Sequence, residues 1–100
     1  MDALEFVKII DKDLTIVDFW APWCGPCKTL SPILDSINEK DTELKILKVN
    51  VDESKELAAQ FGIRSIPTMI FMKDEKEIDR ISGVIPEPQL LKIIEKNRKE

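Results

Sequence analysis

The sequence predicts one α/β domain, a mixed sheet with helices on both faces. The 100 residues can form one hydrophobic core, since 43% are hydrophobic, and no repeat or linker divides the chain. Strand and helix patterns alternate in the first half, which favours parallel strands joined by a right-handed crossover. A predicted hairpin and a last helix follow. We therefore expect residues 1–100 to fold as a single domain.

The first half of the chain is predicted to contain a helix, a strand, a second helix and a second strand. Residues 3–10 carry apolar side chains at helical spacing, and residues 14–20 are rich in the β-branched and aromatic residues typical of strands. Residues 28–40 have a helical apolar pattern, which Pro32 should kink because it removes one backbone hydrogen bond. Residues 44–51 form the second predicted strand.

The second half adds a short helix, a hairpin and a final helix. Residues 54–61 predict a helix whose first residue, a serine, can cap it, with Gly62 as a left-handed stop. Residues 68–73 and 78–82 flank a charged loop and so predict a β-hairpin. Residues 87–99 predict a helix with lysine and arginine at its C-terminal end, where the helix dipole favours them.

Composition alone excludes several classes of function. The formal net charge of −4 argues against a general nucleic-acid surface, which requires clustered positive charge. The longest apolar run, residues 69–72, is far shorter than the about 20 residues that span a bilayer. Histidine and tyrosine are absent, which removes imidazole bases, phenols and most metal sites. Residues 1–5 lack the pattern of a secretory signal, so we expect none.

Two cysteines three positions apart are the strongest functional signal in the chain. Cys24 and Cys27 lie between a predicted strand and a helix that Pro26 can open. Around a first helical turn, positions i and i+3 share one face and can reach disulfide geometry. Unpaired backbone N–H groups and the helix dipole favour thiolate there, which lowers the pKa of the thiol. We expect Cys24 to be the exposed attacking thiol and Cys27 to be buried.

Other interpretations of the cysteine pair are weaker. A zinc site usually takes four ligands, so two cysteines without histidine could complete one, or bridge an iron–sulfur cluster, only across a dimer. A purely structural disulfide would close so small a ring that it stabilises the fold little. Two inert buried thiols would leave Gly25 and Pro26 between them, and their place at a strand–helix junction, as coincidence. We therefore predict that the cysteine pair is redox-active and needs no metal and no organic cofactor, because the two sulfur atoms themselves carry the two electrons of a thiol–disulfide exchange.

The residues around the cysteines resemble the active-site signature of the thioredoxin family. Residues 17–28 have the sequence VDFWAPWCGPCK, and further matches follow in register at Pro32, Lys48, residues 62–68 (GIRSIPT) and Gly83. The resemblance covers nearly the whole chain, and several separated motifs agree. It implies the thioredoxin fold and thiol–disulfide exchange that reduces disulfides in protein substrates.

The resemblance also implies a role for Asp18. This carboxylate shares a strand face with Ile16 and Trp20. From the residues alone, the pattern fits a solvated strand face about as well as a functional site. The resemblance favours a buried carboxylate whose pKa rises by desolvation and which relays the proton of Cys27. Lys48 resembles the family's lysine beside this carboxylate, although a lysine on an outer strand also blocks sheet-to-sheet pairing. Trp20 is expected to pack rather than to contact substrate.

A docking surface for the substrate is also implied by the resemblance. Pro67 matches the family's cis-proline, although only ~5–6% of X–Pro bonds in folded proteins are cis. A cis bond there would leave the Ile66 backbone open to pair with an extended segment of substrate. The apolar docking surface would comprise Trp23, Gly25, Pro26, Ile66, Pro67, Gly83 and Val84.

The chain departs from the family pattern at its N-terminus and in the hairpin. Only 17 residues precede Asp18, so residues 3–10 align with the first helix and nothing remains for the usual first strand. We therefore predict a four-stranded sheet with residues 44–51 at an edge. If residues 4–10 are instead that first strand, the first helix is missing. The hairpin loop, residues 73–76, lacks the expected glycine, which leaves its turn type open.

These inferences predict a cytoplasmic, monomeric thiol–disulfide oxidoreductase. Reduced Cys24 attacks a substrate disulfide, Cys27 resolves the mixed disulfide with help from Asp18, and the Cys24–Cys27 disulfide results. A thioredoxin reductase, either an NADPH-dependent flavoprotein or ferredoxin-linked, would reopen it, and no nucleic-acid or membrane partner is expected. The alternatives are a non-redox binding module with the same fold and an oxidising or isomerising exchange protein. The cysteine pair with Asp18 argues against the first, and the Gly-Pro pair, typical of reducing members of the family, against the second.

Overall fold

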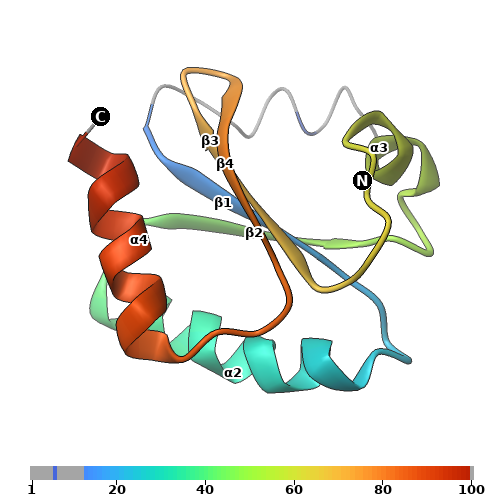
Figure 1. The fold of residues 1–100 in the computed structure, drawn as a ribbon, viewed down its shortest axis with the longest axis horizontal. Coiled ribbons are helices and arrows are strands. Elements are labelled where there is room, and N and C mark those ends of the chain that lie inside the picture. Colours follow the sequence, from blue (N-terminus) through green and yellow to red (C-terminus); the bar gives the residue numbers. More distant parts are fainter. Residues whose placement is uncertain (1–5, 7–12, 100) are drawn as a thin grey trace.

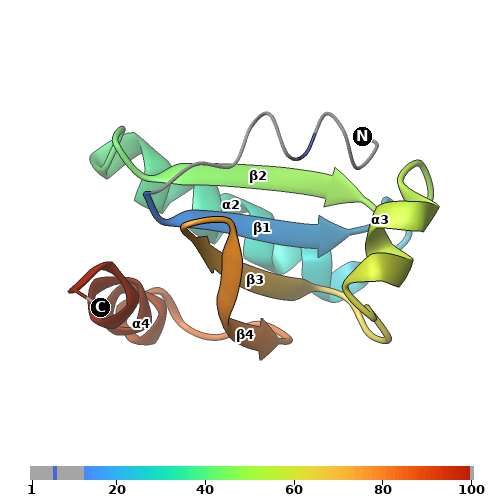
Figure 2. The ribbon, with the colours of Figure 1, turned by 90° about the horizontal axis from the view of Figure 1, so that it is seen from above.

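The structure, a computed structural model, describes residue 6 and residues 13–99. In this part of the chain the elements follow in the order β1 (Thr15–Trp20), α2 (Gly25–Lys40), β2 (Lys45–Asn50), α3 (Lys55–Gln60), β3 (Thr68–Lys73), β4 (Lys76–Ser82) and α4 (Glu87–Lys99). The strands form one sheet in the order β2-β1-β3-β4 (Figure 2). β1 pairs parallel with β2 and antiparallel with β3, and β3 pairs antiparallel with β4. Within residue 6 and residues 13–99, the sheet is the predicted mixed, four-stranded one, with β2 at its edge.

Helices cover both faces of the sheet, with α2 and α4 on one side and α3 on the other (Figure 1). The alternation along β1 explains these two layers, because successive side chains of a strand point to opposite faces. Ile16 belongs to the core cluster that α2 and α4 cover, whereas Val17 and Phe19 belong to the cluster that α3 covers. Asp18 follows the parity of Ile16, and its side chain lines a cavity together with residues of α2.

Apolar stripes anchor α2 and α4 to the sheet. Leu30, Leu34 and Ile37 are buried at spacings of three and four residues along α2, and Leu90 and Ile94 are buried along α4. Truncating one such buried leucine or isoleucine to alanine typically costs about 2–5 kcal/mol of stability. The beginning of α2, which carries the second cysteine, is therefore held against a rigid sheet.

Two helix ends differ from the sequence prediction. α2 begins at Gly25, one residue before the start expected at Pro26 and three before the apolar pattern of residues 28–40, because Cys24 occupies the N-cap position. Pro32 lies inside α2, and the kink expected there stays a prediction. α3 ends at Gln60, and Ser54 occupies its N-cap position without a side-chain capping hydrogen bond.

The hairpin between β3 and β4 turns without a glycine. Asp74 and Glu75 both adopt left-handed backbone, with φ of 56° and 65°. Positive φ at two central residues is the geometry of a two-residue type I′ turn. The turn is thus tighter than the predicted charged loop, and β4 begins at Lys76 rather than at residue 78.

The predictions for residues 3–10, a helix or instead a strand over residues 4–10, fall outside the described residues except at Phe6. Phe6 is buried, and its ring lies edge-on to that of Phe61 with centroids 5.5 Å apart. Gly62, after α3, has a φ of 63°, which confirms the predicted left-handed stop. Among residue 6 and residues 13–99, no helix has the length and apolar character needed to cross a bilayer.

Candidate active site

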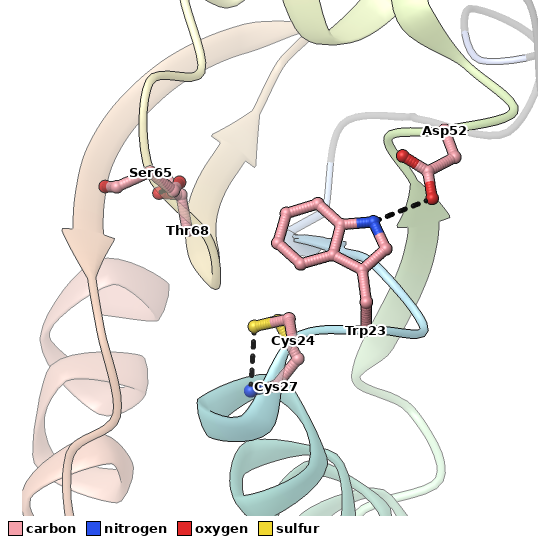
Figure 3. Close-up of a disulfide and its surroundings, with 6 residues drawn as sticks. All are labelled: Trp23, Cys24, Cys27, Asp52, Ser65 and Thr68. Carbon is pink, nitrogen blue, oxygen red and sulfur yellow. Dashed lines mark hydrogen bonds between the residues drawn. A yellow bond between two sulfur atoms is a disulfide. The ribbon is translucent and has the colours of Figure 1, made fainter.

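The two cysteines lie where the chain leaves β1 and enters α2. The Cys24 N–H donates to the Ala21 carbonyl at 3.2 Å, which closes the turn after the strand. Cys24 caps α2, and its Sγ accepts the backbone N–H of Cys27 at 3.2 Å (Figure 3). The two residues form a disulfide, with their Cα atoms 5.3 Å apart. The spacing argument for a disulfide across a first helical turn is confirmed.

The expected difference in exposure between the two cysteines is wrong for this disulfide form. Cys24 is 5% exposed and Cys27 is 4% exposed, so both are buried. Cys24 turns inward because its sulfur caps the helix and bonds to Cys27, and Ile66 packs against the small cluster that the cysteines form with Ala21. In this disulfide form, little of either cysteine is therefore open to a reaction partner.

Trp23 stands out beside the disulfide as a large apolar side chain that is 69% exposed. Its indole Nε1–H donates to Asp52 Oδ2 at 3.0 Å, and the Asp52 N–H donates to Asn50 Oδ1 at 2.9 Å (Figure 3). Sequence analysis missed Asp52. A signal existed, because the segments that follow two parallel strands meet at the same edge of the sheet, and Asp52 follows β2 as Trp23 follows β1.

Asp18 is a buried carboxylate on β1, 2% exposed, and its Oδ1 has no hydrogen-bond partner. It lines a cavity of about 330 Å³ together with Trp20, Cys27, Lys28 and other residues. Burial raises the pKa of Asp18 to about 6, and the charge of a nearby lysine, discussed next, opposes this rise. The structure thus brings Asp18 to the same cavity as Cys27, beneath the disulfide.

Lys48 lies beside Asp18 and on the outer strand of the described sheet, so its position fits both roles considered for it. It lies on the edge strand β2, directly opposite Asp18 in the register of the parallel pair. Its Nζ donates to Ser31 Oγ and to Asp35 Oδ1, each at 2.7 Å. These two residues of α2 were also missed by sequence analysis, although their i, i+4 spacing places them on one helix face.

A loop before β3 lies across from the disulfide (Figure 3). Its Ile66–Pro67 peptide bond is cis, which confirms the expectation drawn from the family resemblance. The Thr68 hydroxyl donates to the Ser65 carbonyl at 2.7 Å, and the Gly83 N–H donates to the Pro67 carbonyl at 2.8 Å. These bonds fix the loop to the start of β3 and to the residue after β4.

The residues predicted for docking differ in how far they reach the surface. Trp23, Gly25 and Pro26 are exposed, whereas Pro67 is buried and Ile66 and Gly83 are partly buried. Val84 is also partly buried and packs against the core that α2 and α4 cover. Trp20 packs against the cysteine cluster, as expected, but its buried Nε1 has no hydrogen-bond partner.

No side-chain cluster with the composition of a metal site occurs in residue 6 or residues 13–99: no three His, Cys, Asp or Glu side chains gather there. The ionisable groups near the disulfide, Asp18, Lys28 and Lys48, are two cations and one buried carboxylate. Such a set suits proton transfer rather than metal binding.

Comparison with known proteins identifies the family. The family model described as Thioredoxin matches residues 1–96. The chain belongs to the thioredoxin family. It is 41% identical over 92 residues to Thioredoxin 1 of Nostoc sp., which covers 90% of this chain and 86% of that protein. It is 43% identical over 98 residues to Thioredoxin 1 of Synechococcus elongatus, and the alignment covers 96% of this chain and 92% of that protein.

The fold agrees with this membership. The X-ray structure of Fasciola hepatica thioredoxin superposes with a TM-score of 0.88 at 37% identity and covers 95% of this chain and 93% of that one. Family membership and the redox-capable cysteine pair make the chain a thiol–disulfide oxidoreductase that acts on protein disulfides.

Proposed function

We propose that this chain reduces protein disulfides, with Cys24 as nucleophile, Cys27 as resolving thiol and Asp18 as proton acceptor. The Cys24 thiolate attacks one sulfur of the substrate disulfide, and the other sulfur leaves as a thiol after taking a proton. Cys27 then loses its proton to Asp18 and attacks Cys24 Sγ, which breaks the mixed disulfide; the second substrate sulfur leaves as a thiolate and takes a proton from solvent, to which Asp18 returns its own. Two electrons pass to the substrate, and the Cys24–Cys27 disulfide remains.

The position of Cys24 at the N-cap of α2 is the observation that carries this proposal. Its Sγ accepts the N–H of Cys27, and the same contact would stabilise negative charge on sulfur after reduction. The positive end of the helix dipole acts in the same direction. An anionic sulfur at neutral pH is both the attacking group and a good leaving group.

The shared cavity supports Asp18 as the group that receives the proton of Cys27. Both residues line it, and it is large enough to hold water between polar side chains. A carboxylate with a pKa of about 6 is ionised near neutrality and still accepts a proton more readily than an ordinary aspartate. Lys48, opposite Asp18 on β2, lies at the same cavity and belongs to the catalytic set.

The exposed apolar residues beside the disulfide support a substrate-docking surface. Trp23 and Pro26 would contact apolar side chains of the substrate, and the backbone of Ile66 would pair with an extended substrate segment. Gly25, Pro67, Gly83 and Val84 complete the surface as the family resemblance implies it.

Family membership supports the remaining assignments, which are part of the same proposal. A thioredoxin reductase, an NADPH-dependent flavoprotein or a ferredoxin-linked enzyme, returns the disulfide to the dithiol. The chain acts as a monomer and as one domain over residues 1–100, and it needs no organic cofactor. A cytoplasmic, reducing compartment suits the reduced state that its activity requires.

The direct test is the reduction of insulin disulfides, followed as turbidity with dithiothreitol as electron donor. Cys24→Ser should abolish the chain's acceleration of insulin reduction, whereas Cys27→Ser should trap substrates as stable mixed disulfides. Asp18→Asn should slow the release of the mixed disulfide more than its formation, and equal slowing of both steps would contradict its role. Iodoacetamide titration of the reduced chain should show one acidic thiol; two thiols with ordinary pKa values would overturn the proposal.

A further inference from the structure

The ammonium of Lys48 is held by two side chains of α2. Its Nζ lies 2.7 Å from Ser31 Oγ and 2.7 Å from Asp35 Oδ1. Ser31 and Asp35 are one helical turn apart and so present adjacent groups on the same face. Ser31 and Lys48 line the cavity that contains Asp18, whereas Asp35 lies outside that lining and is mostly exposed. The ammonium therefore lies at the outer rim of the cavity.

Lys48 is also placed to reach Asp18. The two residues are direct partners in the β1–β2 register, and neighbouring strands lie about 5 Å apart. The four-carbon stem of a lysine is long enough to turn toward either carboxylate. Within the described residues, however, the ion pair of Lys48 is with Asp35, and Asp18 Oδ1 has no hydrogen-bond partner.

We propose that Asp35 and Ser31 are positioning residues that hold the Lys48 ammonium at the cavity rim and thereby keep it from forming an ion pair with Asp18. The inference rests on the proposed role of Asp18 as proton acceptor. Asp35 touches neither cysteine, and it acts only through the placement of Lys48.

The consequence for the reaction follows from the charge of Lys48. A cation in contact with a carboxylate stabilises the ionised form and lowers its pKa. Desolvation is the larger influence on Asp18, and Lys48 at its present distance only partly opposes it, which leaves the pKa at about 6. Direct contact would make Asp18 a weaker base toward the Cys27 thiol. The hold of Ser31 and Asp35 on Lys48, called the clamp below, thus keeps Asp18 basic enough to accept the proton of Cys27.

Among the described groups around Asp18, Lys48 is the cation whose position Ser31 and Asp35 control. From α2, Lys28 and the reduced Cys27 thiol face the same cavity, and the segment after β1 adds only Ala21 and Pro22. From β3, the residue opposite Asp18 is Met69, which carries no charge. Lys28 belongs to the first turn of α2, before the Ser31–Asp35 pair, and it makes no hydrogen bond or ion pair with either of those residues.

The test measures the pKa of Asp18 by carbon NMR of the labelled carboxylate in the oxidised protein, in which the cysteines do not titrate. Asp35→Asn frees Lys48, and because exposed ion pairs are weak the expected fall in the Asp18 pKa is about half a unit. Ser31→Ala should give a smaller fall in the same direction. Glu39→Gln is the matched control, because it removes the same charge from an exposed position of α2 without touching Lys48.

The Lys48→Met background separates the clamp from the direct charge of Asp35. Lys48→Met alone should raise the Asp18 pKa, and Asp35→Asn should then have no effect beyond that of Glu39→Gln. A fall of equal size in both backgrounds would overturn the proposal, as would an Asp35→Asn shift no larger than the control.

In the reduced protein, Asp35→Asn should slow release of the mixed disulfide about twofold at pH 7, with the pH profile displaced toward acid. No displacement of the profile would also contradict the clamp. The pKa shift needs no turnover, so a shift in a chain that fails to reduce disulfides would overturn the proposed function and leave the clamp standing.

Discussion

Replacing Asp18 by asparagine should stabilise the folded protein, and the gain should depend on pH. The pKa of Asp18 is about 6 in the folded chain and 3.8 in an unfolded reference. A shift of about two units corresponds to about 3 kcal/mol between the two protonation states. Because burial raises the pKa, the folded state prefers the protonated acid. The stability that Asp18 contributes is fully present below pH 3.8 and is lost as the pH rises through about 6.

Urea unfolding of the oxidised protein at a series of pH values measures this effect. The difference in unfolding free energy between Asp18→Asn and the parent chain should be near its baseline at pH 3.5. It should grow by about 3 kcal/mol in favour of the variant by pH 7.5. The change with pH is the informative quantity, because an asparagine amide adds a constant hydrogen-bonding term of its own.

Other carboxylates cancel in this comparison. Asp41, which pairs with Arg98, and Glu77, which pairs with Arg80, have lowered pKa values and lose stability toward acid in both proteins alike. A free-energy difference that stays flat from pH 3.5 to 7.5 would refute the reasoning, since it would mean that Asp18 ionises in the folded chain as it does in water.

Three further outcomes are expected. Gly83→Ala should lower the unfolding free energy by about 1–2 kcal/mol, because φ is 92° although a new Cβ would meet no atom within 4 Å; unchanged stability in urea would count against the strain argument. Glu75→Gly should raise the unfolding free energy by about 1 kcal/mol, because glycine relieves the left-handed backbone in the β3–β4 turn. Lys76→Gly, just beyond the turn, should not raise it. Asp52→Asn should shift the indole N–H resonance of Trp23 and increase the ring's mobility in fluorescence anisotropy, with less than ~1 kcal/mol change in stability; an unmoved resonance would show that the hydrogen bond is absent in solution.

Much of the fold follows from local patterns. The two-residue period of β1 predicts that Ile16 and Asp18 share one face, and that face packs under α2. The first turn of α2 follows from Pro26, which stands at a position that favours a helix start, although the apolar pattern begins only at residue 28. The turn at Asp74 and Glu75 was missed because its rule relies on residues that adopt positive φ easily.

The site was predicted less completely than the fold. Cys24 and Cys27 were predicted from their spacing at a helix start, and Asp18 from the family resemblance; the structure places Asp18 and Cys27 at one cavity. Asp52 and Asp35 contact the site from 29 and 13 positions away along the chain. Such contacts depend on the path of the crossover between the parallel strands, which residue types alone do not specify.

The shielding of both sulfurs has a kinetic consequence. Since neither cysteine is more than 5% exposed and Ile66 packs against them, electron donors and substrates must react at the same small exposed part of the cysteine pair. Donors and recipients of electrons must then take turns, as in a ping-pong cycle. An excess of oxidised substrate would occupy this surface and delay the re-reduction of the Cys24–Cys27 disulfide. Turnover would therefore be fastest when the supply of electron donor and of substrate is balanced.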